Sequence, residues 1–286
     1  MTRNLSRYYV GIVCIMLAIA PLRAQPAAPV LPPAPSFADL VDLAEPAPLA
    51  LDATIRSAIR LKPEASPGLR PGHTRFYIVA DLNTLIRGEA GQPARFSYLY
   101  DAANDARGRP AKLAKKRILL LAKPVPGRPG EVQLVAPDAQ LDWTAAVDAR
   151  LRDVLRQLVS GDAPPRITAV GRGFHTAGAL AGESESQIFL STTTGDPVSL
   201  SIIRRPGQTP LWSVALGEIV DEAATAPQPE TLLWYRLACF LPRQLPRESV
   251  ADAGREDAAA LTRDYRLVIE GMGDCPRTRA RRVTDR

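Results

Sequence analysis

The sequence predicts an α+β protein in which an OB-like small β-barrel precedes an antiparallel meander packed with C-terminal helices. Three observations lead to this fold class. Short runs with period-two alternation fill residues 49–137, separated by turns that contain Gly and Pro. A second group of such runs fills residues 166–216. Helical periodicity separates the two groups and returns towards the C-terminal end.

The first 24 residues have the three-part plan of a secretory signal peptide. Arg3 and Arg7 precede an apolar run, and Leu22-Arg23-Ala24 predicts cleavage after Ala24. The apolar run is shorter than the roughly 20 residues that span a bilayer, and no later run matches it. We therefore expect a periplasmic or secreted protein with no transmembrane segment in the mature chain.

Two polar segments flank the expected folded body. Residues 25–35 are rich in proline and predict an extended linker, and residues 276–286 predict a basic, disordered tail. The signal peptide and the tail carry most of the net charge of +6, which leaves the body nearly neutral. Such a body offers no basic face for nucleic acid.

The first domain is predicted over residues 36–161. Ser36 is expected to cap a short helix, and a longer helix is expected to begin after Asp142 and to end at Gly161. Between them, the expected barrel strands cover residues 49–61, 74–86, 94–102, 116–125 and 131–137.

The second domain is predicted over residues 166–275, after a junction at residues 162–165. Four strand-like runs separated by TGDP, PGQTP and similar turns predict an antiparallel meander. Helical spacing follows in residues 231–241 and again from about residue 255 to Gly273. We expect these helices to form a hairpin against the meander.

Removal of the signal peptide leaves two cysteines, Cys239 and Cys275. An even pair in an exported chain predicts one disulfide, which would join the two C-terminal helices. The alternative is a pair of independent buried thiols. We expect Trp212, Trp234 and Tyr235 to pack the second domain around this pair.

The stretch GRGFHTAGALAGESESQIFLST, residues 171–192, is the candidate catalytic segment. His175, one of two histidines in the chain, could serve as the base for Ser184 or Ser186, with Asp196 or Asp221 as the orienting acid. The serines lack a G-x-S-x-G context, and flanking glutamates oppose a developing oxyanion. We interpret the segment as a polar connecting loop.

Metal and cofactor signals are weak. The histidines lie far apart, and DAANDARG, residues 101–108, departs from the spacing of a calcium loop and predicts a turn with self-bonding Asx side chains. No Walker loop occurs, and GRGFHTAG lacks the glycine spacing of a dinucleotide fingerprint. We expect no metal and no cofactor.

Aromatic residues on two neighbouring strands are the candidate ligand face: Phe76, Phe96, Tyr98 and Tyr100. OB-like barrels bind extended ligands on such faces. Period-two aromatics are equally typical of core positions, and we interpret these four as core.

Several segments, among them GRPGEVQLVAPDAQL, ESQIFL, RRPGQ, VALGEIVDEA and TLLWYRLAC, are similar to those of exported alphaproteobacterial proteins that form an uncharacterised family. The resemblance implies export and a shared fold, and it implies no activity.

Together these observations predict an exported accessory or binding module of the cell envelope, without evident catalysis, whose partner is an envelope protein or a small ligand. The alternative is a periplasmic serine-type hydrolase that uses His175. A third hypothesis is peptide binding at a strand edge of the 187–204 hairpin.

Overall fold

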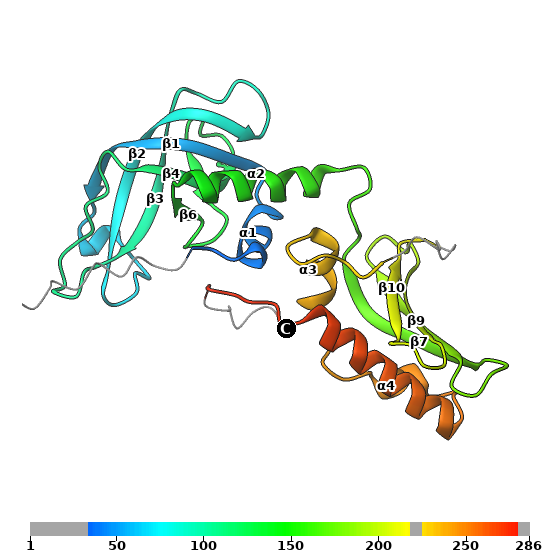
Figure 1. The fold of residues 1–286 in the computed structure, drawn as a ribbon. Helices are drawn as coiled ribbons and strands as arrows, with labels where there is room; N and C mark the ends of the chain where they lie inside the picture. The colour runs from blue at the N-terminus through cyan, green and yellow to red at the C-terminus, as the bar shows by residue number, and fades with distance from the viewer. Residues whose placement is uncertain (1–33, 218–224, 280–286) are drawn as a thin grey trace, which may run out of the picture. The chain divides into compact units, whose positions relative to one another are not determined.

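The computed structural model describes residues 34–217 and 225–279 (Figure 1). They form an α+β fold with a nearly closed antiparallel β-barrel sheet, a second antiparallel sheet and helices, so the predicted fold class is confirmed. The expected signal peptide, the linker up to residue 33 and the end of the basic tail lie outside the described residues. Within the described ranges, no helix is long and apolar enough to cross a bilayer.

The barrel sheet contains all five predicted strands and one further strand. Its strands are β1 (Leu49–Arg60), β2 (His73–Arg87), β3 (Arg95–Ala103), β4 (Arg117–Pro124), β5 (Val132–Leu134) and β6 (Gln140–Asp142). The sheet order is β3-β2-β1-β4-β5, and β6 also pairs with β4. The run at 131–137 forms only the three-residue β5, because the chain turns before β6, with Ala139 N–H bonded to Ala136 O at 3.0 Å.

The first half of β1 is buried on both faces, which explains why apolar residues occupy most of its positions and not only every second one. Leu51, Ala53 and Ile55 face the barrel core, whereas Ala50 belongs to a separate core beneath the helices. This strand therefore joins the barrel to the helices that pack on its outside.

Three helices build that second core: α1 (Phe37–Ala44), α2 (Ala145–Val159) and α3 (Leu232–Ala238). Ser36 caps α1 as predicted, and its side chain forms a capping box with Asp39. The predicted cap of α2 is wrong. Asp142 pairs with Ile118 inside β6, and the Thr144 hydroxyl accepts the bond from Val147 N–H instead.

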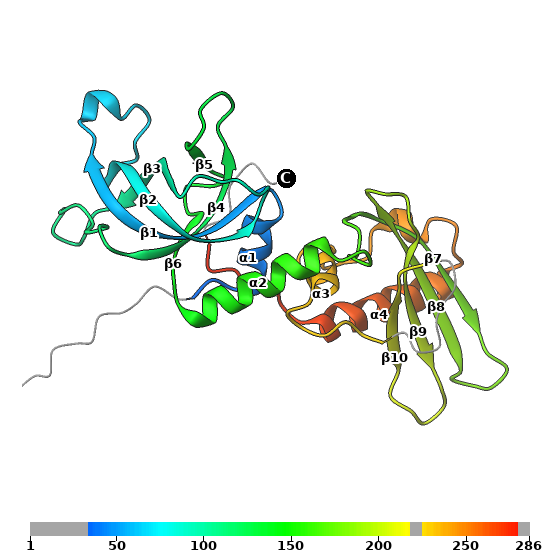
Figure 2. The same cartoon turned by 90° about the horizontal axis from the view of Figure 1, so that it is seen from above.

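The meander consists of β7 (Ile167–Ala177), β8 (Ser184–Thr192), β9 (Val198–Arg204) and β10 (Leu211–Ala215), in the order β10-β9-β8-β7. Helix α4 (Arg255–Met272) runs along one side of this sheet (Figures 1 and 2). Two short 3-10 turns, Pro63–Ala65 and Arg247–Val250, complete the described elements. The hairpin of residues 187–204 lies inside the sheet, since β7 and β10 flank it. It offers no free edge, and the third hypothesis for that hairpin is therefore wrong.

Helix α3 packs differently from the prediction. Trp234 lies edge-on to Phe37 of α1, with ring centroids 6.5 Å apart, and the Tyr235 hydroxyl donates to Asp42. Trp234 and Tyr235 belong to the cluster against which Cys239 and Cys275 pack, as expected, whereas Trp212 packs against the core of the meander. Helices from both sides of the expected junction thus share one core.

Cys239 and Cys275 are placed at disulfide distance, with their sulfur atoms 2.09 Å apart. Cys239 is the C-terminal cap of α3, and Cys275 follows the end of α4. The pair therefore ties the ends of the two C-terminal helices together, in the arrangement that the sequence predicts.

Candidate functional site

The candidate catalytic segment is a β-hairpin and not a connecting loop. His175 lies in β7, and Ser184 and Ser186 lie in β8. His175 and Ser186 are directly opposite each other in the ladder, and His175 Nδ1 lies 2.8 Å from Ser186 Oγ. The interpretation as a polar loop is wrong, because the small and polar residues on both sides of the turn form the paired strands β7 and β8.

The bonds around Ser186 differ from those of a catalytic triad, because the serine stands between the acid and the histidine. Ser186 Oγ donates its single proton to Asp264 Oδ2 at 2.5 Å, so His175 Nδ1 must be the donor towards Ser186. Asp264 is fully buried and also binds Arg204 Nε at 2.7 Å. A general base must accept the serine proton, and a nucleophile must be reached by the substrate, whereas Ser186 is 0% exposed. The geometry gives this pair a structural role.

The other members of the proposed triad do not join this cluster. Ser184 begins β8 opposite Ala177, and Asp196 lies in the β8–β9 turn, where its carbonyl accepts from Thr192. Asp221 lies outside the described residues. The acid that the structure places beside Ser186 is Asp264 of α4, 78 positions along the chain.

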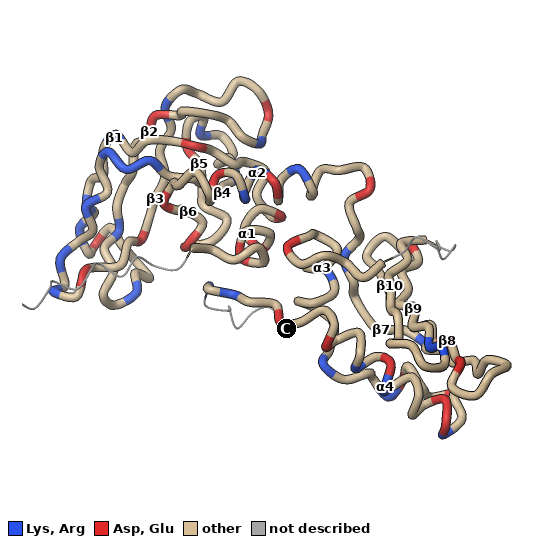
Figure 3. Tube along the Cα trace, in the orientation of Figure 1, with Lys and Arg blue, Asp and Glu red and all other residues tan. Residues whose placement is uncertain are grey.

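Candidate metal ligands do not assemble in the described part of the chain, where no three His, Cys, Asp or Glu side chains gather to bind an ion. In DAANDARG, the Asp105 carboxylate accepts from the backbone of Arg107 and Arg109, each at 2.9 Å. This is the self-bonding turn that the sequence predicts. Over both sheets, Lys and Arg are interspersed with Asp and Glu (Figure 3).

The aromatic stripe lies in the barrel core. Phe76, Phe96 and Tyr98 are 3–4% exposed, and Tyr100 packs against the same cluster. Burial raises the pKa of the Tyr98 hydroxyl, which donates to Gln140 Oε1 at 2.7 Å. These side chains stabilise the barrel, and only Phe96 and Tyr98 reach the hollows described next.

The barrel is not closed by a full strand pair. Its sheet order leaves β3 and β5 as edge strands. They meet through one parallel bridge, between Ser97 and Glu131, and one backbone bond, from Ser97 N–H to Gly130 O at 2.8 Å. We call the gap between β3 and β5 beyond this bridge the seam.

Backbone groups on both sides point into the seam. Because Ser97 N–H points away from β2, strand alternation turns the N–H and C=O groups of Leu99 and Asp101 the same way. On the other side, Val135 N–H bonds to Leu121 O of β4, so the alternate residues Val132 and Leu134 face the seam. Beyond the bridge at Ser97 and Glu131, no ladder pairs Leu99 and Asp101 of β3 with Leu134 of β5 within the described residues. The seam therefore has two unpaired strand edges.

A hollow of about 780 Å³ lies along the seam. Its lining combines apolar side chains with those of Ser97, Lys123 and Gln133, and Leu99 is 52% exposed there. Ion pairs stand at its two ends: Arg75 with Asp101, at 2.6 Å, and Arg128 with Glu131, at 3.2 Å. The Arg75 guanidinium holds the pKa of the Asp101 carboxyl below its usual value, so this end stays charged at neutral pH.

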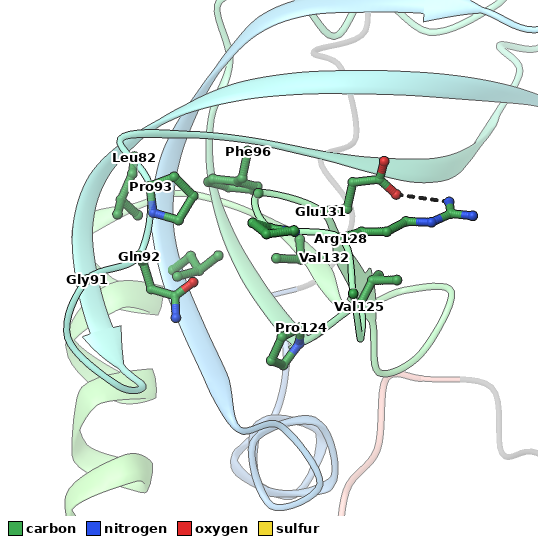
Figure 4. Close-up of a pocket in the computed structure, with 14 residues that line it drawn as sticks. Leu82, Gly91, Gln92, Pro93, Phe96, Pro124, Val125, Arg128, Glu131 and Val132 are labelled. Atoms are coloured by element: carbon green, nitrogen blue, oxygen red, sulfur yellow. Dashed lines mark hydrogen bonds and ion pairs between the residues drawn. The ribbon is translucent and has the colours of Figure 1, made fainter.

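A smaller hollow of about 320 Å³ adjoins the first at the bridge. Figure 4 shows Leu82, Pro93 and Phe96 on one side of it, and Pro124, Val125 and Val132 across from them. The two hollows share four lining residues: Val125, Arg128, Glu131 and Val132. They form one continuous site in which an apolar recess opens beside a strand edge.

The loop between β4 and β5, residues 125–131, shapes both hollows. Gly127 and Gly130 have φ of 71° and 82°, conformations that favour glycine and let the chain reverse over a short span. Glu131 N–H bonds to Arg128 O at 3.0 Å and closes the turn that carries the ion pair. The sequence VPGRPGE contains this signal, but its glycines and prolines predict only a turn.

Comparisons with known proteins found no match: no family model, no curated protein and no solved structure matches the chain. The resemblance to exported alphaproteobacterial proteins stays a prediction. The site has to be interpreted from its own chemistry, which consists of backbone edges, apolar side chains and ion pairs. Such groups bind and orient a ligand, and they place no nucleophile beside a base.

Proposed function

We propose that the protein is an exported binding module that holds an extended polypeptide segment in the seam of its barrel. One observation carries the proposal: beyond the bridge at Ser97 and Glu131, no ladder pairs the edges of β3 and β5 within the described residues, so Leu99, Asp101 and Leu134 present edge groups to the seam. An extended segment adds to such an edge as a new strand, and its backbone bonds then supply affinity that depends little on its sequence.

The side chains at the seam favour a segment that carries apolar residues at alternate positions. Leu99 and Tyr77, which pair across β3 and β2, and Val135 form the apolar part of the lining of the larger hollow. Since alternate side chains of an added strand point the same way, every second residue of the segment would contact this apolar strip.

The smaller hollow supports an anchor for one apolar side chain. Leu82, Phe96 and Val132 belong to its lining, and the polar side chains of Gln92, Arg128 and Glu131 line it as well. A pocket that fully desolvates one large side chain supplies most of the selectivity of a binding surface.

The cell envelope is the proposed place of action. The disulfide-distance pair Cys239 and Cys275 is compatible with an oxidising compartment, and the first 24 residues predict export to one. The segment that is bound would then belong to another envelope protein.

The proposal is tested by selecting ligands from a random-peptide phage library on the immobilised protein. The best peptide, labelled with fluorescein, is then titrated with the protein, and its anisotropy is measured. Leu99→Asp replaces an exposed apolar side chain of the seam with a carboxylate, and we expect it to weaken binding at least about tenfold.

Leu180→Asp is the matched control, because Leu180 is also a large exposed apolar residue, 63% exposed, in the turn between β7 and β8. Circular dichroism checks that both variants are folded. The proposal fails if no peptide is enriched, or if the selected peptide binds Leu99→Asp and wild type equally well.

A further inference from the structure

A recess lined by apolar side chains and arginines lies between helix α2 and the end of strand β2. Its volume is about 280 Å³. Its lining residues are Ile86, Arg87, Arg152, Leu155, Arg156 and Val159. It shares no lining residue with the two hollows at the seam, so it is a separate site.

Helical spacing brings four of these side chains to one face of α2. They are Arg152, Leu155, Arg156 and Val159, at positions i, i+3, i+4 and i+7. Leu155 is 5% exposed and belongs to the core beneath the helices, and Ile86 packs against the same core. Val159, the last residue of α2, is 64% exposed. The recess therefore continues that core and opens to solvent at Val159.

The charged groups that line the recess are all positive. Arg152 pairs with Asp148 at 2.9 Å, and that aspartate lies outside the lining. Arg156 pairs in the same way with Asp153, at 3.1 Å. Arg156 also offsets the partial negative charge of the last carbonyl groups of α2. Among the described residues that line the recess, none is acidic.

Arg87 is the cation of the recess that has no counter-ion. Its Nη1 atom donates to the carbonyl of Ala44, the last residue of α1, at 3.1 Å, and this bond holds the half-buried side chain in place. No carboxylate pairs with Arg87 in the part of the chain that the structure describes. The remaining N–H groups of its guanidinium are therefore available to an anion, and a carboxylate matches them in geometry.

From these features we infer that the recess binds a free medium-chain alkyl carboxylate. The carboxylate group binds Arg87, and the alkyl chain covers Ile86, Leu155 and Val159. Small-molecule sites combine an apolar lining with a few placed polar groups, and their volumes begin at roughly 300 Å³. The recess is close to this lower limit, so a single short chain suits it better than a complete lipid. Burial of the chain supplies affinity, and the arginines select the sign of the charge.

An NMR titration of the exported protein, labelled with ¹⁵N, tests the inference with octanoate as the probe. We expect saturable chemical-shift changes at Arg87, Leu155 and Val159. 1-Octanol carries the same chain without a charge, and we expect it to bind at least about tenfold more weakly, because it makes no charge-assisted bond to Arg87. Octyltrimethylammonium, which has the opposite charge, is expected to cause no saturable change at these residues.

Three variants separate charge from fold. Arg87→Gln removes the charge, and we expect octanoate to bind it as weakly as octanol does, while the affinity for octanol stays the same. A merely structural role of Arg87 would change both affinities together. Val159→Asp, at an exposed position, is expected to weaken both ligands. Ile59→Asp is the matched control, since Ile59 of β1 is 56% exposed and lies outside the recess.

Sedimentation with vesicles that contain phosphatidylglycerol distinguishes a free carboxylate from a membrane surface. We expect the vesicles not to sediment the protein. Sedimentation of wild type but not of Arg87→Gln would overturn the inference and assign the recess to anionic lipid. The inference also fails if octanoate causes no saturable shifts, if octanol binds as tightly as octanoate, or if Arg87→Gln binds octanoate like wild type.

Discussion

At the scale of single residues, the cluster of His175, Ser186, Asp264 and Arg204 shows how geometry assigns a role that residue types alone leave open. A serine beside a histidine suggests catalysis. The bond to Asp264 decides against catalysis, since Ser186 donates to this buried carboxylate and has no proton left for His175. This cluster fastens α4 to the centre of the second sheet, with Arg204 of β9 as the counter-charge.

Replacement of Ser186 tests this structural role. Ser186→Ala removes one of the bonds that solvate the buried Asp264 carboxylate, and we expect the free energy of unfolding to fall by about 1–3 kcal/mol. Urea unfolding followed by circular dichroism measures the loss. Thr262→Ala, at an exposed helix position, is the control. Unchanged stability, together with the loss of an ester- or peptide-cleaving activity, would assign the serine a catalytic role instead.

The same cluster marks the limit of prediction from sequence. His175 and Ser186 face each other within one hairpin, a proximity that alternation along both strands could have indicated. Asp264 comes from a distant helix, and no local pattern points to it.

At the scale of elements, local signals predicted most strands and helices well. The Ser36 cap and the β1 alternation follow from neighbouring residues, and both are found in the structure. The failures have tertiary causes. Asp142 was drawn into a ladder with β4, and Trp234 and Tyr235 turned towards α1, because a shared apolar core outweighs the local preference of each residue.

The link between α3 and α4 allows a prediction about stability. Cys239 and Cys275 lie 36 positions apart. In the chain-entropy account, a loop of this length stabilises the folded state by about 4 kcal/mol. We expect Cys239→Ser, Cys275→Ser and the double variant to lose similar amounts in urea unfolding. A double variant as stable as wild type would show that the cross-link contributes nothing.

At the scale of the whole molecule, the barrel was predictable and its opening was not. Strand number and spacing indicated a small barrel, and its closure depends on how β3 meets β5. That contact is decided by a three-residue strand and by one backbone bond, from Ser97 to Gly130. Neither has a signature in sequence, because edge pairing is set by register over the whole sheet.

Amide hydrogen exchange of the wild-type protein, with and without the selected peptide, tests the central claim most directly. If the peptide adds as a strand in the seam, exchange at Leu99 and Asp101, at Leu134, or at all three slows on binding, because these N–H groups gain partners. Unchanged exchange at all three amides of a saturated complex, with protection elsewhere, would contradict the account and move the binding site away from the seam.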